Sequence, residues 1–154
     1  MAIEIGAAVQ QVLDLLKETF EGSPPSGSAY TDPGPGGGIF GTLSPIDSKA
    51  ASEPRCGSSI AAQVGHIVFA IDAASAWIRG DHSSRKWKES WRISTVSDAE
   101  WNDLRQQVEA GYRDLRAAIE SHAATSDDAF GSAVAIVAHM AYHLGAIRQK
   151  TKVR

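Results

Sequence analysis

Apolar side chains recur every three or four residues along most of the chain, which is the period of one face of an α-helix. One such stripe runs through residues 3–20 and stops at Gly22. A second runs through residues 60–79 behind a serine that can cap it, and stops at Gly80. Because glycine is common just after a helix end, both stripes are predicted to be amphipathic helices of these lengths.

Two further helices are predicted in the C-terminal half. Ser97 and Glu100 have the spacing of a capping box, and the apolar positions behind them continue to Ile119. A fourth stripe begins with two acidic residues at 127–128, which suit the positive end of a helix dipole, and extends to about Lys150.

No segment alternates apolar and polar residues with the period of a β-strand, and no internal repeat is present. Four amphipathic helices bury one face each most economically in a bundle. The predicted fold is therefore all-α, a four-helix bundle in a single domain over residues 1–154. Short connections are expected between the second, third and fourth helices.

Two irregular stretches interrupt the helices. Residues 22–57 form a long crossover rich in glycine and proline, with a short helix or turn expected within 44–52. Loops of this length are usually functional or disordered, so a lid over a site and a plain surface crossover both remain open. Residues 81–96 are polar apart from Trp87 and Trp91, which we interpret as an aromatic plug over one end of the core, with a substrate-facing wall as the alternative.

Charge and composition narrow the class of partner. The 154 residues carry a net charge of −3, so the basic footprint of a nucleic-acid-binding protein is missing. No uninterrupted apolar run approaches the roughly 18–20 residues of a membrane span, and no membrane partner is expected. The single cysteine, Cys56, cannot form an internal disulfide, which favours a cytoplasmic location.

Three histidines are the strongest candidates for chemistry. His139 and His143 lie four residues apart on the fourth helix, so their Cβ atoms stand roughly 5–6 Å apart on one face. Met140 occupies the position of the glutamate in an HExxH metalloprotease helix, which excludes that signature. His66, beside small residues on the second helix, can supply a third ligand from across the core.

Three protein ligands would leave an open coordination position, as in catalytic rather than structural metal sites. The alternative is that the imidazoles are ordinary core histidines with hydrogen-bond partners. The remaining two histidines, His82 and His122, are expected to be surface residues. Other residues considered near the site are Gln63, Trp77 and Tyr142 as pocket walls, and Asp14, Glu18 and Asp72 as groups that orient an imidazole, although structural surface roles are favoured for these three.

Three segments of the chain, Ser59–Ile67, Trp87–Trp91 and His139–Gln149, resemble the DinB-like (DinB/YfiT) metalloprotein superfamily. The resemblance extends from the first helix to Gln149, and it implies an up-down-down-up bundle that is often a homodimer. It also implies a divalent metal ion, nickel or zinc, held by His66, His139 and His143.

Characterised members of that superfamily include S-transferases that use the thiols bacillithiol or mycothiol, and a mycothiol-dependent maleylpyruvate isomerase. The first functional hypothesis is accordingly a metal-dependent enzyme, a transferase or hydrolase, acting on a small-molecule substrate with a low-molecular-weight thiol as possible co-substrate. The second is a non-catalytic bundle stapled by its metal, which binds a small molecule or serves in a stress response. The third is a metal-free scaffold, which requires that the three histidines do not converge.

Overall fold

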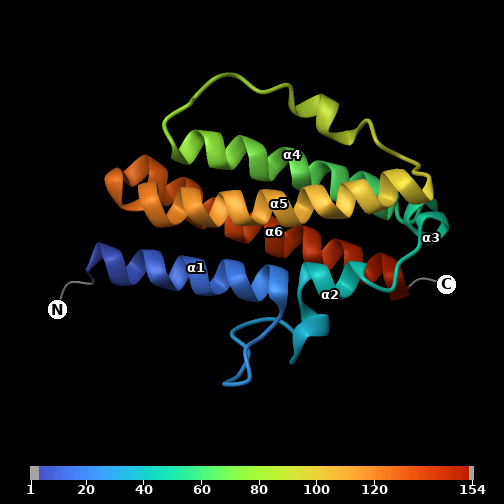
Figure 1. Cartoon of the computed structure of the whole chain (residues 1–154), viewed down its shortest axis with the longest axis horizontal. Coiled ribbons are helices and arrows are strands. Elements are labelled where there is room, and N and C mark those ends of the chain that lie inside the picture. The colour runs from blue at the N-terminus through green and yellow to red at the C-terminus, as the bar shows by residue number, and fades with distance from the viewer. Residues whose placement is uncertain (1–3, 153–154) are drawn as a thin grey trace.

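Four long helices lie side by side in the computed structural model, which describes residues 4–152 (Figure 1). They are α1 (Ile5–Glu21), α4 (Ile60–Ile78), α5 (Asp98–His122) and α6 (Asp127–Lys152). Both α1 and α4 pack against α5 and α6. The predicted all-α class is confirmed, since residues 4–152 contain no β-strand beyond one isolated bridge between Arg55 and Ser58.

The predicted helix ends are reproduced closely because their capping residues act locally. The Ser59 side chain accepts a hydrogen bond from the Ala62 amide at 3.0 Å, and Ser97 and Glu100 form the predicted capping box. The predicted start of the first helix at residue 3 lies outside the described residues.

The described part of the chain contains six α-helices, because two short ones, α2 (Ile39–Leu43) and α3 (Ser48–Ser52), interrupt the first crossover. The second of these confirms the short element expected within 44–52. The first was not predicted, and it exists because Ile39 and Leu43, which are 0% and 2% exposed, complete the core between α1 and α5.

The prediction of a short connection between the second and third long helices is wrong. The chain leaves α4 at Ile78 and begins α5 only at Asp98, and the segment between them contains the 3₁₀ turn η2 (Trp87–Trp91). Figure 1 shows that α4 and α5 run in the same direction, so the connecting chain must return along the length of the molecule. This return segment, residues 79–97, covers α4.

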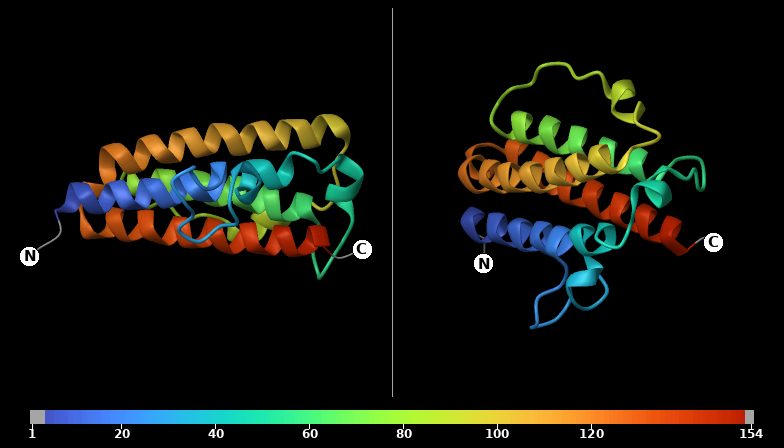
Figure 2. Two further views of the ribbon diagram at one scale, coloured as in Figure 1. Left: turned by 90° about the horizontal axis from the view of Figure 1, so that it is seen from below. Right: turned by 45° about the vertical axis from the view of Figure 1, so that its right-hand side comes forward.

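Residues 22–38 lie on the other side of the molecule from the return segment, below α1 and α2 in Figure 1 and in the right-hand view of Figure 2. The buried Glu18 carboxylate holds this loop by accepting hydrogen bonds from the backbone amides of Ala29, Tyr30 and Thr31 at 2.9–3.0 Å. Burial alone would raise the pKa of Glu18, but these bonds lower it to about 2. Glu18 is thus a structural anchor and orients no imidazole.

Helices α4 and α6 are each long and apolar enough to cross a membrane when judged by length and composition alone. The expectation that no segment approaches a membrane span is therefore too strict. In this structure 61% of the most apolar window of α4 and 39% of that of α6 are buried inside the protein. Because core helices pass the same test, this is weak evidence for insertion into a bilayer.

Candidate metal centre

His66 on α4 and the pair His139 and His143 on α6 converge on one point. One nitrogen from each ring lies within 4.8 Å of the other two, and the Nε2 atoms of His66 and His139 are 3.1 Å apart. His66 and His143 are buried, at 6% and 2% exposed, whereas His139 is half-buried. Helical spacing fixes the pair, and the packing of α4 on α6 brings the third ring to it.

The return segment fixes the orientation of His66. Its Nδ1 lies 2.7 Å from Oγ of Ser90, which is 5% exposed and donates its own proton to the Trp87 carbonyl at 2.6 Å. Since the serine proton is already used, Nδ1–H of His66 donates to the serine oxygen and the Nε2 lone pair faces the other histidines. A bond from the second nitrogen is how proteins set the tautomer of a metal-binding histidine.

Gln63 fixes His143 in the same way. Its amide nitrogen donates to Ser58 at 3.0 Å, so its oxygen accepts from Nδ1–H of His143 at 2.6 Å. The Nε2 atom of His143 is buried and has no hydrogen-bond partner in the described structure. A buried nitrogen lone pair of this kind costs free energy unless a cation or donor meets it, so the three side chains fit a divalent ion.

The electrostatics of the cluster keep the rings neutral. The pKa of His143 is lowered from its ordinary 6.5 to about 4, mainly by burial and in smaller part by the neighbouring His139 and His66. Burial also lowers the pKa of His66, with a contribution from His139, and burial lowers that of His139. Neutral imidazole is the form that binds a metal ion.

Trp91 and Trp87 lie beside His66, so the predicted plug at the end of the core is wrong, and the alternative of a substrate-facing wall stays a prediction. The Trp91 ring stacks on His66 with centroids 4.2 Å apart and planes at 16°, and it stays 43% exposed. Trp87 packs edge-on against Phe69 at 5.2 Å. The irregular backbone of the return segment, which follows no helical period, explains why spacing alone did not place these rings.

The Ile93 side chain packs directly on Gly65 and helps to hold this cover. A Cβ atom at Gly65 would lie 3.0 Å from Cδ1 of Ile93, so a larger residue beside His66 would require the Ile93 side chain to shift. The Ser59 hydroxyl also donates to the Ser94 carbonyl at 2.6 Å, which ties the segment to the start of α4. The residues that cover the site therefore come from 87–94 and not from 22–57.

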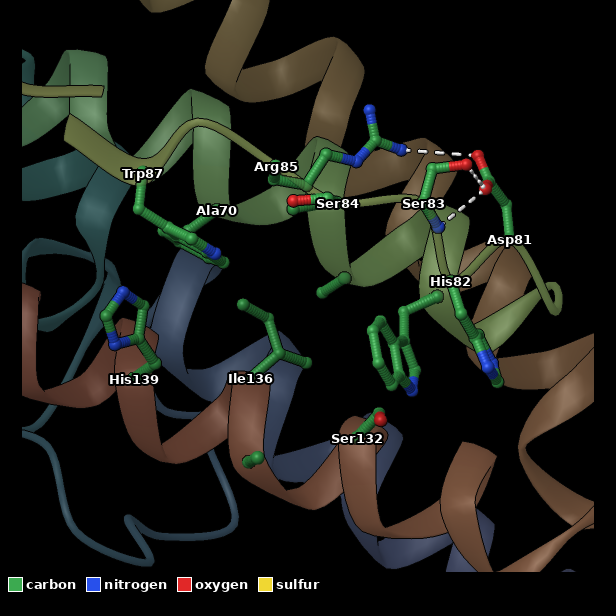
Figure 3. A pocket seen from close by; sticks show the side chains of 14 residues that line it. Ala70, Asp81, His82, Ser83, Ser84, Arg85, Trp87, Ser132, Ile136 and His139 are labelled. Carbon is green, nitrogen blue, oxygen red and sulfur yellow. Dashed lines mark hydrogen bonds and ion pairs between the residues drawn. The ribbon is translucent and has the colours of Figure 1, made fainter. Parts of the chain in front are cut away.

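An open groove of about 500 Å³ leads away from the cluster, with His139 in its lining (Figure 3). Trp77 lines the groove as predicted, and so does His82, which was expected to be an ordinary surface residue. His82 is exposed, but it stacks on Trp77 with centroids 4.2 Å apart.

The other candidates have different positions. Tyr142 makes a T-shaped contact with the His143 ring, with centroids 5.1 Å apart, and is 71% exposed. Asp72 forms an ion pair with Arg85 at 3.6 Å, and Asp14 accepts a hydrogen bond from Gln10 at 2.9 Å. These observations agree with the surface roles favoured for both acids.

His122 is half-buried and its Nδ1 has no hydrogen-bond partner in the described structure, so the expectation of an ordinary surface residue is wrong there. The cysteine, Cys56, is free and exposed. Ser90 was missed by sequence analysis because it lies 24 residues from His66 in a polar segment without periodicity.

No protein-family model, no curated protein and no solved structure matches this chain. The resemblance to the DinB-like superfamily therefore stays a prediction, carried by the segments that contain the histidines and the two tryptophans.

Proposed function

We propose that this protein binds a divalent metal ion through His66, His139 and His143. The observation that carries the proposal is the convergence of three neutral imidazoles within 4.8 Å, one of which presents a buried nitrogen without a partner. Nickel and zinc are the proposed ions, since both accept imidazole ligands.

The groove beside His139 supports an enzyme rather than a purely structural site. A divalent ion in an open site of this kind lowers the pKa of a bound water or thiol, which makes it a usable nucleophile near neutral pH. We therefore propose a metal-dependent transferase or hydrolase with a small-molecule substrate and, following the resemblance, a low-molecular-weight thiol as co-substrate. The chain's own contribution is to position the ligands through Ser90 and Gln63.

Membership of the DinB-like superfamily is part of the same proposal. The directions of α1, α4, α5 and α6 in Figure 1 support an up-down-down-up bundle. A homodimer is also proposed, supported by an apolar hollow of about 280 Å³ between α1 and α6 that is bordered by the exposed Leu15 and Val134. Sedimentation velocity on the wild type and on a Val134→Glu variant tests the dimer, and a wild-type monomer at all concentrations would contradict it.

Metal content tests the site. The wild type, His139→Ala and the control His122→Ala are expressed without a polyhistidine tag, dialysed against nickel or zinc and analysed by mass spectrometry. We expect about one equivalent in the wild type and the control, and a large loss in His139→Ala, because two ligands bind an ion much more weakly than three. Equal, near-zero metal in all three proteins would overturn the proposal.

The alternative is a non-catalytic bundle in which the ion only staples α4 to α6. The two are separated by assaying thiol transfer to an electrophile, using several thiols, with the metal-loaded wild type and His139→Ala. Turnover that requires the ligand set supports the enzyme. Full metal loading without turnover for any thiol supports the staple.

A further inference from the structure

The groove that starts at His139 runs along α4 and α6 under the return segment. On α6 it extends from His139 to Ser132, and on α4 from Ala70 to Trp77. Each pair is seven residues apart, which at 1.5 Å per residue is a length of about 10 Å. Figure 3 shows His139 and Trp87 at one end, His82 and Asp81 at the other, and Ile136 between them.

The wall of the groove that α4 and α6 form is mostly apolar. Its lining side chains on α4 and α6 are mostly alanine, with isoleucine and tryptophan as the larger apolar members and two polar residues from α6: Ala70, Ala73, Ala74, Trp77, Ser132, Ala135, Ile136 and His139. A volume of about 500 Å³ lies within the range of roughly 300–1,000 Å³ that small-molecule sites have. A wall of this kind stabilises a bound ligand by removing apolar surface of the ligand from water.

The opposite wall, formed by the return segment, is polar and carries more negative than positive charge. Arg85 pairs with Asp81 at 3.5 Å and also with Asp72 of α4 at 3.6 Å, so two carboxylates face one guanidinium. Asp128, in the first turn of α6, accepts a hydrogen bond from the Trp77 indole at 2.8 Å and lies 3.5 Å from the His82 ring. A negatively charged group at the far end of the ligand would therefore meet an excess of carboxylates.

We infer that this groove binds the apolar tail of an elongated ligand whose polar head group reaches the metal ion. The inference rests on the proposed metal centre, because the head group is placed by the ion and the tail by the groove. The ligand class is thus an amphiphilic small molecule with a metal-binding head, an unbranched or flat apolar body, and no negative charge at its far end.

A series of n-alkyl hydroxamates tests this inference, because the head group binds metal ions and only the tail varies. The probes run from acetohydroxamate to decanohydroxamate, and binding to the cobalt-loaded protein is measured by calorimetry and by the visible spectrum. We expect the affinity to rise about threefold for each added methylene, and then to reach a plateau once the tail passes Trp77.

Two matched variants locate the tail. Ala135 on α6 and Ala117 on α5 are both exposed, but only Ala135 lines this groove. Ala135→Trp should reduce the affinity for decanohydroxamate roughly tenfold or more and leave acetohydroxamate unchanged. Ala117→Trp should bind both probes as the wild type does.

The failures of the two proposals are distinguishable. If acetohydroxamate binds but the affinity does not change with tail length along the series, the groove does not bind the tail. The same conclusion follows if Ala135→Trp leaves the effect of tail length intact. Either result overturns the inference about the groove and leaves the proposed metal site unaffected. Absence of metal uptake overturns the metal site itself. Tighter binding of a probe whose tail ends in a carboxylate than of its neutral counterpart would overturn the conclusion that the far end carries no negative charge.

Discussion

At the scale of single residues, the candidate site depends on two side chains that bind no metal themselves. Ser90 and Gln63 each accept a hydrogen bond from Nδ1–H of a histidine and so direct the opposite nitrogen towards the other two rings. Gln63 was predicted to be near the site because it shares a helix line with His66. Ser90 was not, because its place depends on how the return segment folds over α4.

Replacing Ser90 with alanine should weaken metal binding without abolishing it. The bond at 2.7 Å to His66 is lost, so the ring is free to rotate and to change tautomer. Loss of such a partner typically lowers metal affinity about 10–100-fold. Competition with a chelator of known affinity measures the change. Ser84→Ala, a groove-lining serine without a contact to the three histidines, serves as the control, and an equal loss in both variants would contradict the positioning role.

Metal retention should depend on pH in a way set by these histidines. Protons and metal ions compete for the imidazole nitrogens. Because the pKa of His143 lies at about 4 instead of 6.5, competition at this ring begins only at lower pH. We expect the ion to be held down to about pH 6 and released as the pH falls towards 4, as followed by equilibrium dialysis. Unchanged retention at about pH 3 would argue against imidazole ligands.

At the scale of elements, sequence periodicity and caps predicted the four long helices well because both are local properties. The direction of each helix is not local, and for this reason the return segment between α4 and α5 was expected to be short. The helix α2 was not predicted for a related reason. Its five residues are too few to show a helical period, and Ile39 and Leu43 are buried by tertiary packing, which the sequence pattern does not reveal.

The loop after α1 provides a prediction at this scale. Glu18→Gln removes the charge that three backbone amides and the Thr31 hydroxyl share, and we expect a loss of about 1–3 kcal/mol in the free energy of unfolding. Denaturant titration measures it, with the exposed Glu109→Gln as control. The metal centre should keep its affinity, because the loop lies on the other side of the molecule.

The Glu18 carboxylate should also make the stability of the wild type depend on pH in the acidic range. The pKa of Glu18 is depressed in the folded state, from 4.5 to about 2. Its contribution to stability is therefore fully present above about pH 4.5 and is lost progressively as the pH falls towards 2. Glu18→Gln should lack this part of the acid dependence. If the free energy of unfolding of the wild type and of Glu18→Gln changed in parallel between about pH 4.5 and pH 2, the role of Glu18 as an anchor would be contradicted.

At the scale of the whole molecule, the three ligands join two helices that are distant in sequence, His66 and His139 being 73 residues apart. An ion bound there favours the folded chain over the unfolded one. The spacing of four between the paired histidines could be predicted from sequence, but the contribution of His66 depends on the packing of α4 against α6.

Metal should accordingly stabilise the whole protein. At a free concentration a thousandfold above the dissociation constant, binding to the folded state alone adds about 4 kcal/mol, which is a rise of roughly 10 °C in Tm for a chain of this size. Calorimetry with nickel or zinc, before and after a chelator, measures the shift. In His139→Ala the shift should largely disappear, and an equal shift in that variant would place the stabilising ion elsewhere.

Because Trp91 stacks on His66, intrinsic tryptophan fluorescence should report metal binding at the site. An indole in contact with a metal-bound imidazole is close enough for an open-shell ion such as nickel to quench its fluorescence. Trp77, Trp87 and Trp91 are 38%, 50% and 43% exposed, while Trp101 is 2% exposed and donates to the Ile46 carbonyl, so the emission of Trp101 falls at a shorter wavelength. Occupancy of the site can therefore be followed as a partial loss of the red-shifted emission, to which Trp91 contributes, without any label.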